Sequence, residues 1–391
     1  MKILILEDED GKFESIDSVV KSAEPDAEIS RVTNWYDYAQ RVASQDFDLI
    51  LLDIIVPRSA KSPKAEDHCD ELVETTRSLD ESRCFKTPAI VLTQYLEQSE
   101  GFAKRLNAVD ITVIHFDLES KIWREALTRK ISAARPPISF DFLIVCALPK
   151  EALAFSQLGA EVQPAKTIEG LTCRQLRLEG LRGVIVTPPR MGLVSAAVIT
   201  SFCIERLRPR LVCMSGICGG ILGETKIYDT VVSDLCYQHD VGKWSRDGFK
   251  YEHYDAQISG SVRSKVEEML DDPEFITRLR HGFALRQSEF PNGVEEFDFD
   301  VRIGTTSSGS AVIAQTEKVA EFSEGHRKLC AFEMEIYALY EACRLSGQDI
   351  PFFAVKSVVD DGGENKGDRF HRVGCLLSAK FLLQAIPRIL Q

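Results

Sequence analysis

Short apolar runs alternate with longer amphipathic segments along the whole chain, and this pattern predicts an α/β protein. A strand of a parallel sheet is buried on both faces, so it reads as a continuous apolar run. In the first third of the chain, five such runs are separated by segments of helix length, which predicts a doubly wound, flavodoxin-like parallel sheet. The predicted strands are Ile3–Leu6, Ile29–Val32, Leu49–Leu52, Ala89–Leu92 and Ile111–Ile114.

The same alternation resumes near residue 142 and predicts a second, larger α/β domain. Its strand signals are Phe142–Cys146, Gly183–Val186, Leu211–Met214, Thr230–Val232 and Phe352–Val355. Its helical patterns are Leu193–Leu207, Val262–Leu270 and Glu333–Leu345. Between the domains, Pro136 and Pro137 disfavour helix at and before their own positions. We therefore predict a domain at 1–133, a linker at 134–140 and a domain at 141–391.

The composition limits the partners and the compartment. The chain has 391 residues and a formal net charge of −13, so it lacks the basic surface that binding to a nucleic-acid backbone requires. Its apolar runs are far shorter than the ~20 residues that span a membrane, and no secretory pattern follows Met1. The eleven cysteines include no C-x-x-C pair, which favours reduced, buried thiols. We expect a cytoplasmic protein without nucleic-acid or membrane partners.

Acidic and hydroxyl side chains follow the strands of the first domain at the edge where parallel strands end. Glu7 and Asp8 follow the first strand, Asp53 follows the third, and Thr93 follows the fourth. Three carboxylates at one edge would repel one another unless a cation lay among them, and oxygen ligands suit Mg²⁺. The natural use of Asp53 is then to accept a phosphoryl group.

These residues and their surroundings, at 3–9, 48–57 and 90–93, resemble a response-regulator receiver domain. The resemblance implies that Asp53 is phosphorylated, that Glu7 and Asp8 bind Mg²⁺ together with Asp53, and that Thr93 moves to meet the phosphate. It also implies a sensor histidine kinase as partner, with a second receiver protein as a further candidate. The alternatives are a solvated acidic turn and an unphosphorylated pseudo-receiver that serves only for docking.

Two departures mark this first domain. The Lys-Pro pair that receivers carry after the fifth strand is absent, and His115 in Val-Ile-His-Phe-Asp (113–117) is the candidate replacement. The stretch Arg58–Asp67, rich in Ser, Lys and Pro, predicts an enlarged, mobile loop beside Asp53.

In the second domain, candidate residues for glycosidic cleavage lie at strand-to-helix junctions. That reaction needs an acid for the leaving base, a base for the attacking water and groups that hold the ribose hydroxyls. Residues 333–335, Glu-Met-Glu, and 356–361, Lys-Ser-Val-Val-Asp-Asp, offer carboxylates for these tasks. Residues 214–220, Met-Ser-Gly-Ile-Cys-Gly-Gly, predict a glycine-rich turn after a strand, where backbone can approach a ligand closely.

Five segments in order resemble the superfamily of purine nucleoside phosphorylases and methylthioadenosine/S-adenosylhomocysteine nucleosidases. They are residues 144–152, 190–197, 215–220, 332–335 and 355–361. The resemblance implies an α/β nucleoside phosphorylase-type fold that needs no cofactor for its chemistry. Asp360 then donates a proton to the purine, Glu151 activates water, and Met334 and Glu335 hold the ribose. Gly219 and Lys356 lie in the same motifs and are further expected substrate contacts.

Several departures from this superfamily bear on the substrate. Ile217 stands where the glycine segment usually has serine, which removes a hydroxyl from the phosphate pocket of phosphorylases and favours water as nucleophile. Val312 replaces the aromatic that stacks on the purine. Arg190, with Lys243 and Arg246 in the 240–246 loop, suits an anionic 5′-substituent, because a guanidinium matches phosphate geometry.

A receiver fused to such a domain resembles the effectors of Detocs antiphage systems, which cleave ATP to adenine and ribose triphosphate. The favoured hypothesis is a phosphorylation-controlled N-glycosidase acting on ATP and also on dATP, forming a homo-oligomer. One alternative is a methylthioadenosine/S-adenosylhomocysteine nucleosidase or nucleoside phosphorylase under receiver control. The other is a non-catalytic module that senses nucleotide.

Overall fold

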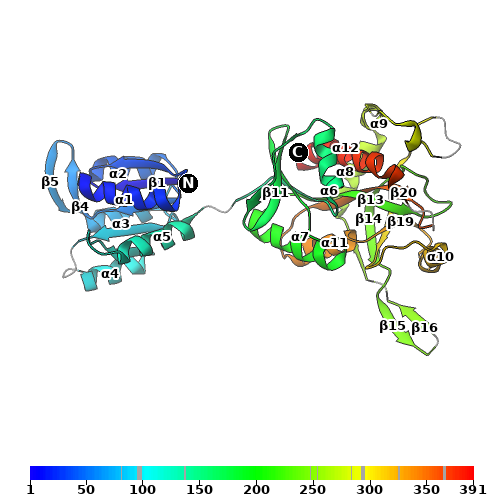
Figure 1. The fold of residues 1–391 in the computed structure, drawn as a ribbon. Coiled ribbons are helices and arrows are strands. Elements are labelled where there is room, and N and C mark those ends of the chain that lie inside the picture. Colours follow the sequence, from blue (N-terminus) through cyan, green and yellow to red (C-terminus); the bar gives the residue numbers. More distant parts are fainter. Residues whose placement is uncertain are drawn as a thin grey trace. The chain divides into compact units, whose positions relative to one another are not determined.

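The computed structural model describes residues 1–391 except 81, 95–98, 136–137, 247, 253, 283, 292–295, 325 and 364–366. The chain divides into two compact units, Met1–Pro136 and Pro137–Gln391 (Figure 1). The division falls inside the predicted linker. That linker is shorter than predicted at its far end, because Phe140 is buried in the core of the second unit.

The first unit contains a five-stranded sheet in which all neighbouring strands are parallel. The strand order is β2-β1-β3-β6-β7, so the chain moves first to one edge and then to the other, as in a doubly wound fold. The bounds are β1 Lys2–Leu6, β2 Glu28–Val32, β3 Leu49–Leu52, β6 Ala89–Thr93 and β7 Ile111–His115. All five strands predicted for this region are present.

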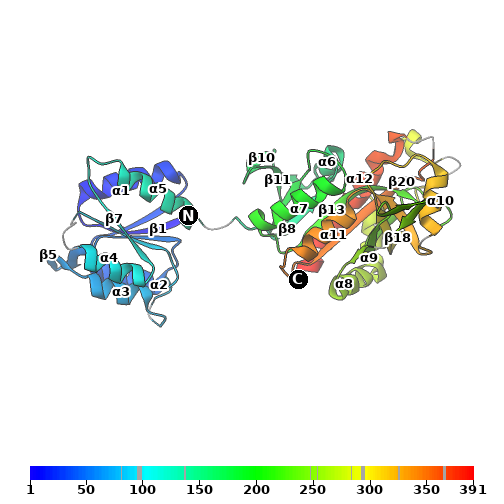
Figure 2. The same ribbon diagram turned by 90° about the horizontal axis from the view of Figure 1, so that it is seen from below.

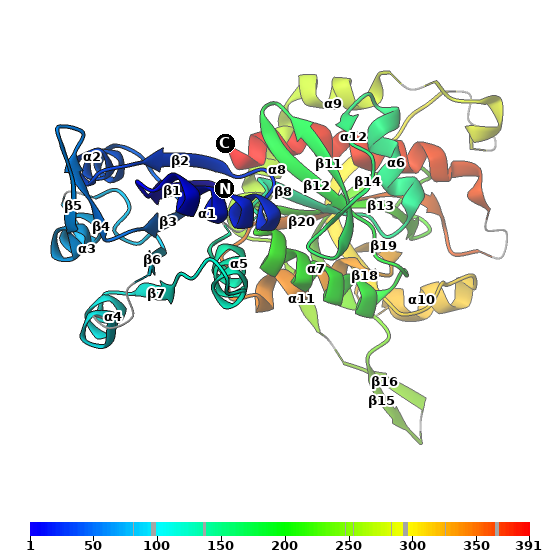
Figure 3. The same cartoon turned by 60° about the vertical axis from the view of Figure 1, so that its left-hand side comes forward.

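Helices cover both faces of this sheet because successive side chains of each strand point to opposite sides. Ile3 and Ile5 pack with the helices α1 and α5, whereas Leu4 and Leu6 pack with α2 and α3. Figures 2 and 3 show the two helical layers on either side of the sheet. The bounds are α1 Asp10–Ala23, α2 Trp35–Ser44, α3 Cys69–Arg77, α4 Ser99–Ala108 and α5 Ile122–Ala134.

The prediction of an enlarged, mobile loop at 58–67 is wrong. Strands β4 (Ile55–Ser59) and β5 (Ser62–Asp67) form an antiparallel hairpin there. All six side chains of β5 are exposed, so the sequence carries no alternation of buried and exposed positions. Backbone pairing, which composition does not reveal, decides this structure.

The second unit is built on a mixed, eleven-stranded sheet. Its main path is β10-β11-β12-β8-β13-β19-β18-β14-β17, while β20 pairs with β13 and β14, and β9 pairs with β11. The bounds are β8 Phe142–Val145, β9 Glu161–Val162, β10 Lys166–Ile168, β11 Leu171–Leu178, β12 Leu181–Val186, β13 Val212–Gly220, β14 Thr230–Gln238, β17 Asp255–Gln257, β18 Val301–Ser308, β19 Leu329–Glu333 and β20 Phe352–Asp360. A separate hairpin, β15 (Gly242–Ser245) and β16 (Gly248–Tyr251), replaces the predicted 240–246 loop.

Helices cover this sheet on two sides (Figure 1). Helix α12 contacts β13, β20, α6 and α8, and α7 contacts α11. The bounds are α6 Pro149–Gln157, α7 Leu193–Leu207, α8 Gly260–Asp271, α9 Pro273–Arg280, α10 Thr316–Glu324, α11 Ile336–Leu345 and α12 His371–Leu390, with short 3₁₀ turns η1 Gln287–Glu289 and η2 Asp368–Phe370. Among the described residues, only 368–390 form a helix long and apolar enough to cross a membrane, and most of it is buried in this core.

All eleven cysteines are buried and unpaired, as the absence of paired spacings predicted. Burial raises the pKa of several of these thiols, including Cys173 and Cys69, each to about 11. They therefore remain neutral and pack as small apolar side chains.

Candidate active site

A cavity of about 370 Å³ lies where β13, β19 and β20 approach the start of α6. The ends of strands from distant parts of the sequence meet there, so it collects side chains that no local pattern could bring together. The lining includes most of the residues predicted for catalysis or substrate binding, namely Glu151, Gly219, Met334, Glu335, Lys356 and Asp360. Arg190 is exposed and is not among the described residues that line it.

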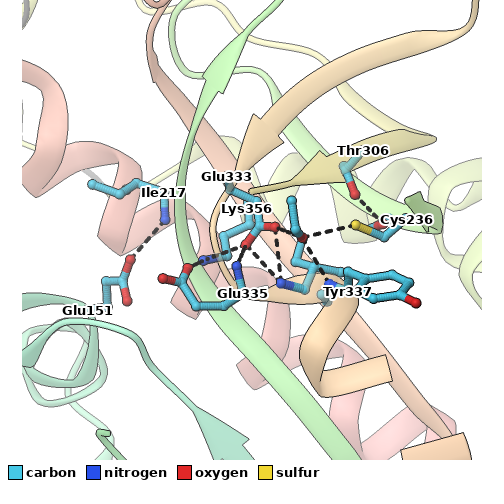
Figure 4. Close-up of polar contacts among 12 residues, drawn as sticks. Glu151, Ile217, Cys236, Thr306, Glu333, Glu335, Tyr337 and Lys356 are labelled. Carbon is cyan, nitrogen blue, oxygen red and sulfur yellow. Dashed lines mark hydrogen bonds and ion pairs between the residues drawn. The ribbon is translucent and has the colours of Figure 1, made fainter. Parts of the chain in front are cut away.

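Lys356 is the centre of the polar wall of this cavity (Figure 4). Its Nζ lies 3.3 Å from Oε2 of Glu335 and 3.5 Å from Oε2 of Glu333, and all three side chains are buried. Burial alone would lower the pKa of Lys356, but the carboxylates of Glu335, Glu151 and Glu333 outweigh it and raise the pKa. The ammonium is therefore permanent and compensates the surrounding negative charge.

Glu333 belongs to the Glu-Met-Glu segment at 333–335, but no specific role was predicted for it. Its carboxylate accepts hydrogen bonds from the backbone N–H of Glu335 at 2.9 Å, from that of Ile336 at 3.0 Å and from the hydroxyl of Ser308. Burial raises the pKa of Glu333 to about 7, with Lys356 opposing the shift. The residue ends β19 and binds the first N–H groups of α11, so the predicted helix at 333–345 begins only at Ile336. In the sequence, the position of Glu333 directly after the apolar run 329–332 indicated a carboxylate at the end of a strand.

Glu335 is held from two sides. Its Oε1 accepts a hydrogen bond of 2.9 Å from the backbone N–H of Gly192, and its Oε2 faces Lys356. Gly192 has φ +107°, a conformation that other residues rarely adopt. The turn at 190–192 thus fixes the carboxylate that was predicted to hold the ribose.

Glu151 lies in the first turn of α6 and is almost fully buried. Its Oε2 accepts from the backbone N–H of Leu148 at 2.9 Å, and its Oε1 accepts from that of Ile217 at 3.1 Å. Burial raises the pKa of Glu151, and the ammonium of Lys356 opposes the rise. A carboxylate with a raised pKa is better suited to take a proton from water than an ordinary one.

The glycine-rich turn predicted after Met214 is wrong, because β13 continues as a strand to Gly220. A Cβ at Gly216 would lie 2.3 Å from Oε1 of Glu151, and one at Gly219 would lie 2.2 Å from the ring of Phe332. The glycines therefore make room for side chains of the cavity rather than for a turn.

Asp360 ends β20 and faces the cavity, and its Oδ1 accepts a 2.9 Å hydrogen bond from the backbone N–H of Gly362. The neighbouring Asp361 is exposed and does not appear among the described lining residues. Val312, at the position expected for a stacking aromatic, also lines the cavity and is 64% exposed.

Residues 141–386 match the family model described as the phosphorylase superfamily. The chain belongs to this superfamily. The match covers more than half of the chain and coincides with the second unit, which we call the phosphorylase-superfamily unit.

Relatives of this chain align with different fractions of its length. The ATP nucleosidase Cap17 of Escherichia coli (strain KTE188) is 23% identical over 294 residues, which are 72% of this chain and 58% of that protein. The chain therefore spans less than two thirds of Cap17. A 5′-methylthioadenosine/S-adenosylhomocysteine nucleosidase of Geobacillus thermodenitrificans is 26% identical over 224 residues, 57% of this chain and 85% of the relative. The protein y4jS of Sinorhizobium fredii is 24% identical over the full length of both chains.

Solved structures agree with the fold of the phosphorylase-superfamily unit. The 5′-methylthioadenosine/S-adenosylhomocysteine nucleosidase of Colwellia psychrerythraea, in complex with adenine, superimposes with a TM-score of 0.51 at 21% identity, covering 65% of this chain and 97% of its own. The futalosine hydrolase of Helicobacter pylori gives a TM-score of 0.50 at 19% identity, covering 63% and 96%.

The first unit has its own cluster of acids outside the phosphorylase-superfamily unit. Ligand atoms of Glu7, Asp8 and Asp53 all lie within 4.8 Å of one another, and this set of oxygen donors fits Mg²⁺. Thr93 is buried at the end of the neighbouring strand β6. The structure thus brings together the acids that the sequence placed at this edge.

Asp53 has a cation partner that the sequence did not predict. Lys12 of α1 contacts Asp53, and its Nζ lies 2.8 Å from Oε2 of Glu7. His115, the predicted substitute for the missing lysine, is exposed at the end of β7. The sequence pattern points to the segment after the fifth strand, whereas Lys12, early in α1, reaches back over the same sheet edge. Burial raises the pKa of Glu7 to about 7, with Lys12 opposing the shift.

Proposed function

We propose that the chain hydrolyses the N-glycosidic bond of ATP, and of dATP, to adenine and the ribose 5′-triphosphate, under control of phosphorylation at Asp53. The enzyme class rests on the family: the chain is an N-glycosyl hydrolase of the nucleosidase type. The observation that carries the proposal is a single cavity in which Asp360 faces the buried cluster of Glu335, Lys356 and Glu151.

In the proposed reaction, a water oxygen bonds to C1′ of the ribose while the bond from C1′ to N9 of the purine breaks and its electrons pass to the base. Asp360 gives a proton to N7, so that adenine leaves neutral, and Glu151 takes a proton from the water. Glu335 accepts hydrogen bonds from the ribose hydroxyls, and Met334 packs on the sugar. Lys356, whose Nζ lies 3.3 Å from Oε2 of Glu335, holds that carboxylate in position for this task.

Water is the favoured nucleophile because the side chain beside Glu151 on β13 is the apolar Ile217. Ile217 lines the cavity and engages Glu151 through its backbone N–H, so its side chain offers no hydroxyl for an inorganic phosphate. We expect no cofactor for this chemistry.

In the first unit, the proposal is that Asp53 receives a phosphoryl group from a sensor histidine kinase, directly or through a second receiver protein. Glu7, Asp8 and Asp53 would hold Mg²⁺, which would supply charge to neutralise the phosphoryl oxygens. Thr93 would then contact the phosphate. The resemblance to antiphage effectors supports a cytoplasmic defence role in which ATP destruction is triggered by infection, in a homo-oligomer.

A second candidate is a 5′-methylthioadenosine/S-adenosylhomocysteine nucleosidase. Leu148 and Met191 give the cavity apolar walls that would suit a thioether. The third, a nucleotide sensor without catalysis, requires the carboxylates of the cavity to be inert.

One experiment separates the three. The full-length protein, with and without a small-molecule phosphodonor and Mg²⁺, is incubated in phosphate-free buffer with ATP, dATP or methylthioadenosine, and free adenine is measured by chromatography. The proposal expects adenine from ATP, stimulated by the phosphodonor, and none from the Glu335→Gln variant. Adenine from methylthioadenosine alone would select the second candidate. Binding of ATP without any adenine release would select the sensor.

A further inference from the structure

The rim of the active-site cavity continues into a second cavity. Besides Asp360, assigned to the base, and Glu335, assigned to the ribose, the lining of the cavity includes Leu148, Met191, Asp368 and His371. A cavity of about 270 Å³ shares Asp368 and His371 with it and adds Lys150 and Arg372. A substituent that leaves the ribose along this rim would therefore meet cationic side chains.

Most other cations near the cavity are already compensated. Lys356 is 1% exposed and faces three glutamates. Arg372 makes two contacts with Glu289, of 2.6 Å and 2.5 Å. These two side chains cannot turn to a phosphate without leaving a buried or half-buried carboxylate unpaired.

Another neighbouring space is unsuited to an anion. It shares Val312 with the active-site cavity, has a volume of about 410 Å³, and is lined in part by His239, Asp240, Lys318 and Glu321. Burial lowers the pKa of His239 to about 4, so that its ring is neutral at pH 7. Lys318 is paired with Glu321, and Asp240 is acidic.

Lys150 remains, with His371 beside it, and both contact the exposed carboxylate of Asp368. Nζ of Lys150 lies 2.5 Å from Nδ1 of His371 and 3.3 Å from Oδ1 of Asp368, while Nδ1 of His371 lies 2.6 Å from the same oxygen. The Asp368 side chain is 86% exposed, and ion pairs with exposed partners contribute little stability. A phosphate oxygen can therefore take the place of the Asp368 carboxylate at low cost.

We infer that Lys150 and His371 form the subsite for the 5′-phosphate chain of the substrate, with Asp368 occupying it in the substrate-free protein. This inference rests on the proposed function, since it identifies which groups distinguish a nucleotide from a nucleoside. Lys150 precedes the water-activating Glu151 in α6, and His371 begins α12, so both stand at helix N-termini, which also favour anions.

The test compares ATP with adenosine in full-length variants. Lys150→Met and His371→Asn should raise KM for ATP by about one to two decades each, the size of one charge-assisted hydrogen bond, and should raise KM for adenosine far less. Asp368→Asn should lower KM for ATP, because it removes the competing carboxylate. Lys166→Met, an exposed lysine on β10 outside both cavities, is the matched control.

Binding supplies a second measurement that does not depend on turnover. In the Asp360→Asn background, calorimetry should show ATP binding weakened by Lys150→Met and adenosine binding unaltered. An equal loss for both ligands, or no loss, would overturn the subsite. If the wild type releases adenine from ATP and Lys150→Met behaves like Lys166→Met, the subsite is wrong but the proposed function stands. If the wild type neither binds nor cleaves ATP, both the subsite and the proposed function are wrong.

A separate observation in the first unit concerns Lys12. Lys12 is 3% exposed, and its ammonium contacts both Glu7 and Asp53, two of the three acids that would bind a divalent cation. A cation tethered by four methylene groups and a free cation cannot occupy the same carboxylate oxygens at once. The geometry points to Lys12 as an internal competitor of Mg²⁺, which must swing away before the metal and then the phosphoryl group can bind to Asp53.

Calorimetric titration of the full-length protein with Mg²⁺ tests this role directly. Lys12→Met should bind Mg²⁺ at least about tenfold more tightly than the wild type, because like charge no longer opposes the metal. Lys12→Arg should keep the weak affinity, and His115→Ala should match the wild type. Circular dichroism verifies that Lys12→Met is folded. Equal Mg²⁺ affinity in wild type and Lys12→Met would overturn the competition, whatever the outcome for ATP cleavage.

Discussion

The charge of Lys356 makes a sharp prediction about stability. The substitution Lys356→Met keeps the length of the side chain but removes its ammonium. The buried carboxylates of Glu333, Glu335 and Glu151 then lose the cation that compensates their charge. Removing one partner of a buried ion pair costs about 3–5 kcal/mol. For a unit of this size each kcal/mol lowers Tm by roughly 2–4 °C, so the expected loss is about 6–20 °C at pH 8.

The pH dependence distinguishes this cause from lost packing. Burial raises the pKa of Glu333 to about 7 in the folded protein, above its value in the unfolded chain. The folded state therefore binds protons more tightly, and stability falls as pH rises through the interval between the two values. Without the ammonium this pKa rises further, so the destabilisation of Lys356→Met should be largest at pH 8 and should shrink toward pH 5.

Differential scanning calorimetry of the full-length protein measures this effect, with the transition of the first unit as an internal reference. Lys356→Arg, which keeps the charge, should lose far less than Lys356→Met. A Tm for Lys356→Met within about 2 °C of the wild type at pH 8 would refute the compensation argument, since one kcal/mol alone shifts Tm by that much. A deficit that grows toward pH 5 would refute it as well.

Three further predictions concern catalysis and control. Asp360→Asn should lower adenine release by about 10²–10⁴-fold, as expected for loss of a positioned proton donor, whereas Asp361→Asn at the exposed neighbour should change it little; the reverse result would move the acid to Asp361. Adenine release should proceed without added phosphate and give ribose with a free anomeric hydroxyl, which mass spectrometry can verify; a phosphate requirement with a ribose 1-phosphate product would show phosphorolysis. Asp53→Ala should abolish stimulation by a phosphodonor while residues 141–391 keep their own thermal transition; stimulation equal to wild type would leave the first unit a docking platform.

The sequence by itself determined the elements whose signal is local. Helix α7 has the predicted bounds, Leu193–Leu207, and the five strands of the first unit lie where the apolar runs placed them. These segments are long enough, and periodic enough, for burial to be decided by their own residues. The motifs that resemble the superfamily likewise pointed to Glu335, Lys356 and Asp360, and all three line one cavity.

The tertiary structure alone decided what depends on contacts between distant segments. Strand pairing made 55–67 a hairpin and extended β13 through its glycines, since backbone partners are not encoded by composition. Lys12 reaches Asp53 across 41 residues, and Glu333 faces Lys356 from a different strand. Tertiary structure also decided the position of Arg190. Its guanidinium is chemically suited to phosphate, but the residue lies outside the described wall of the cavity. The sign of a side chain's charge can be read from the sequence. The electrostatic energy of that charge depends on neighbouring residues, which are brought close only when the chain folds.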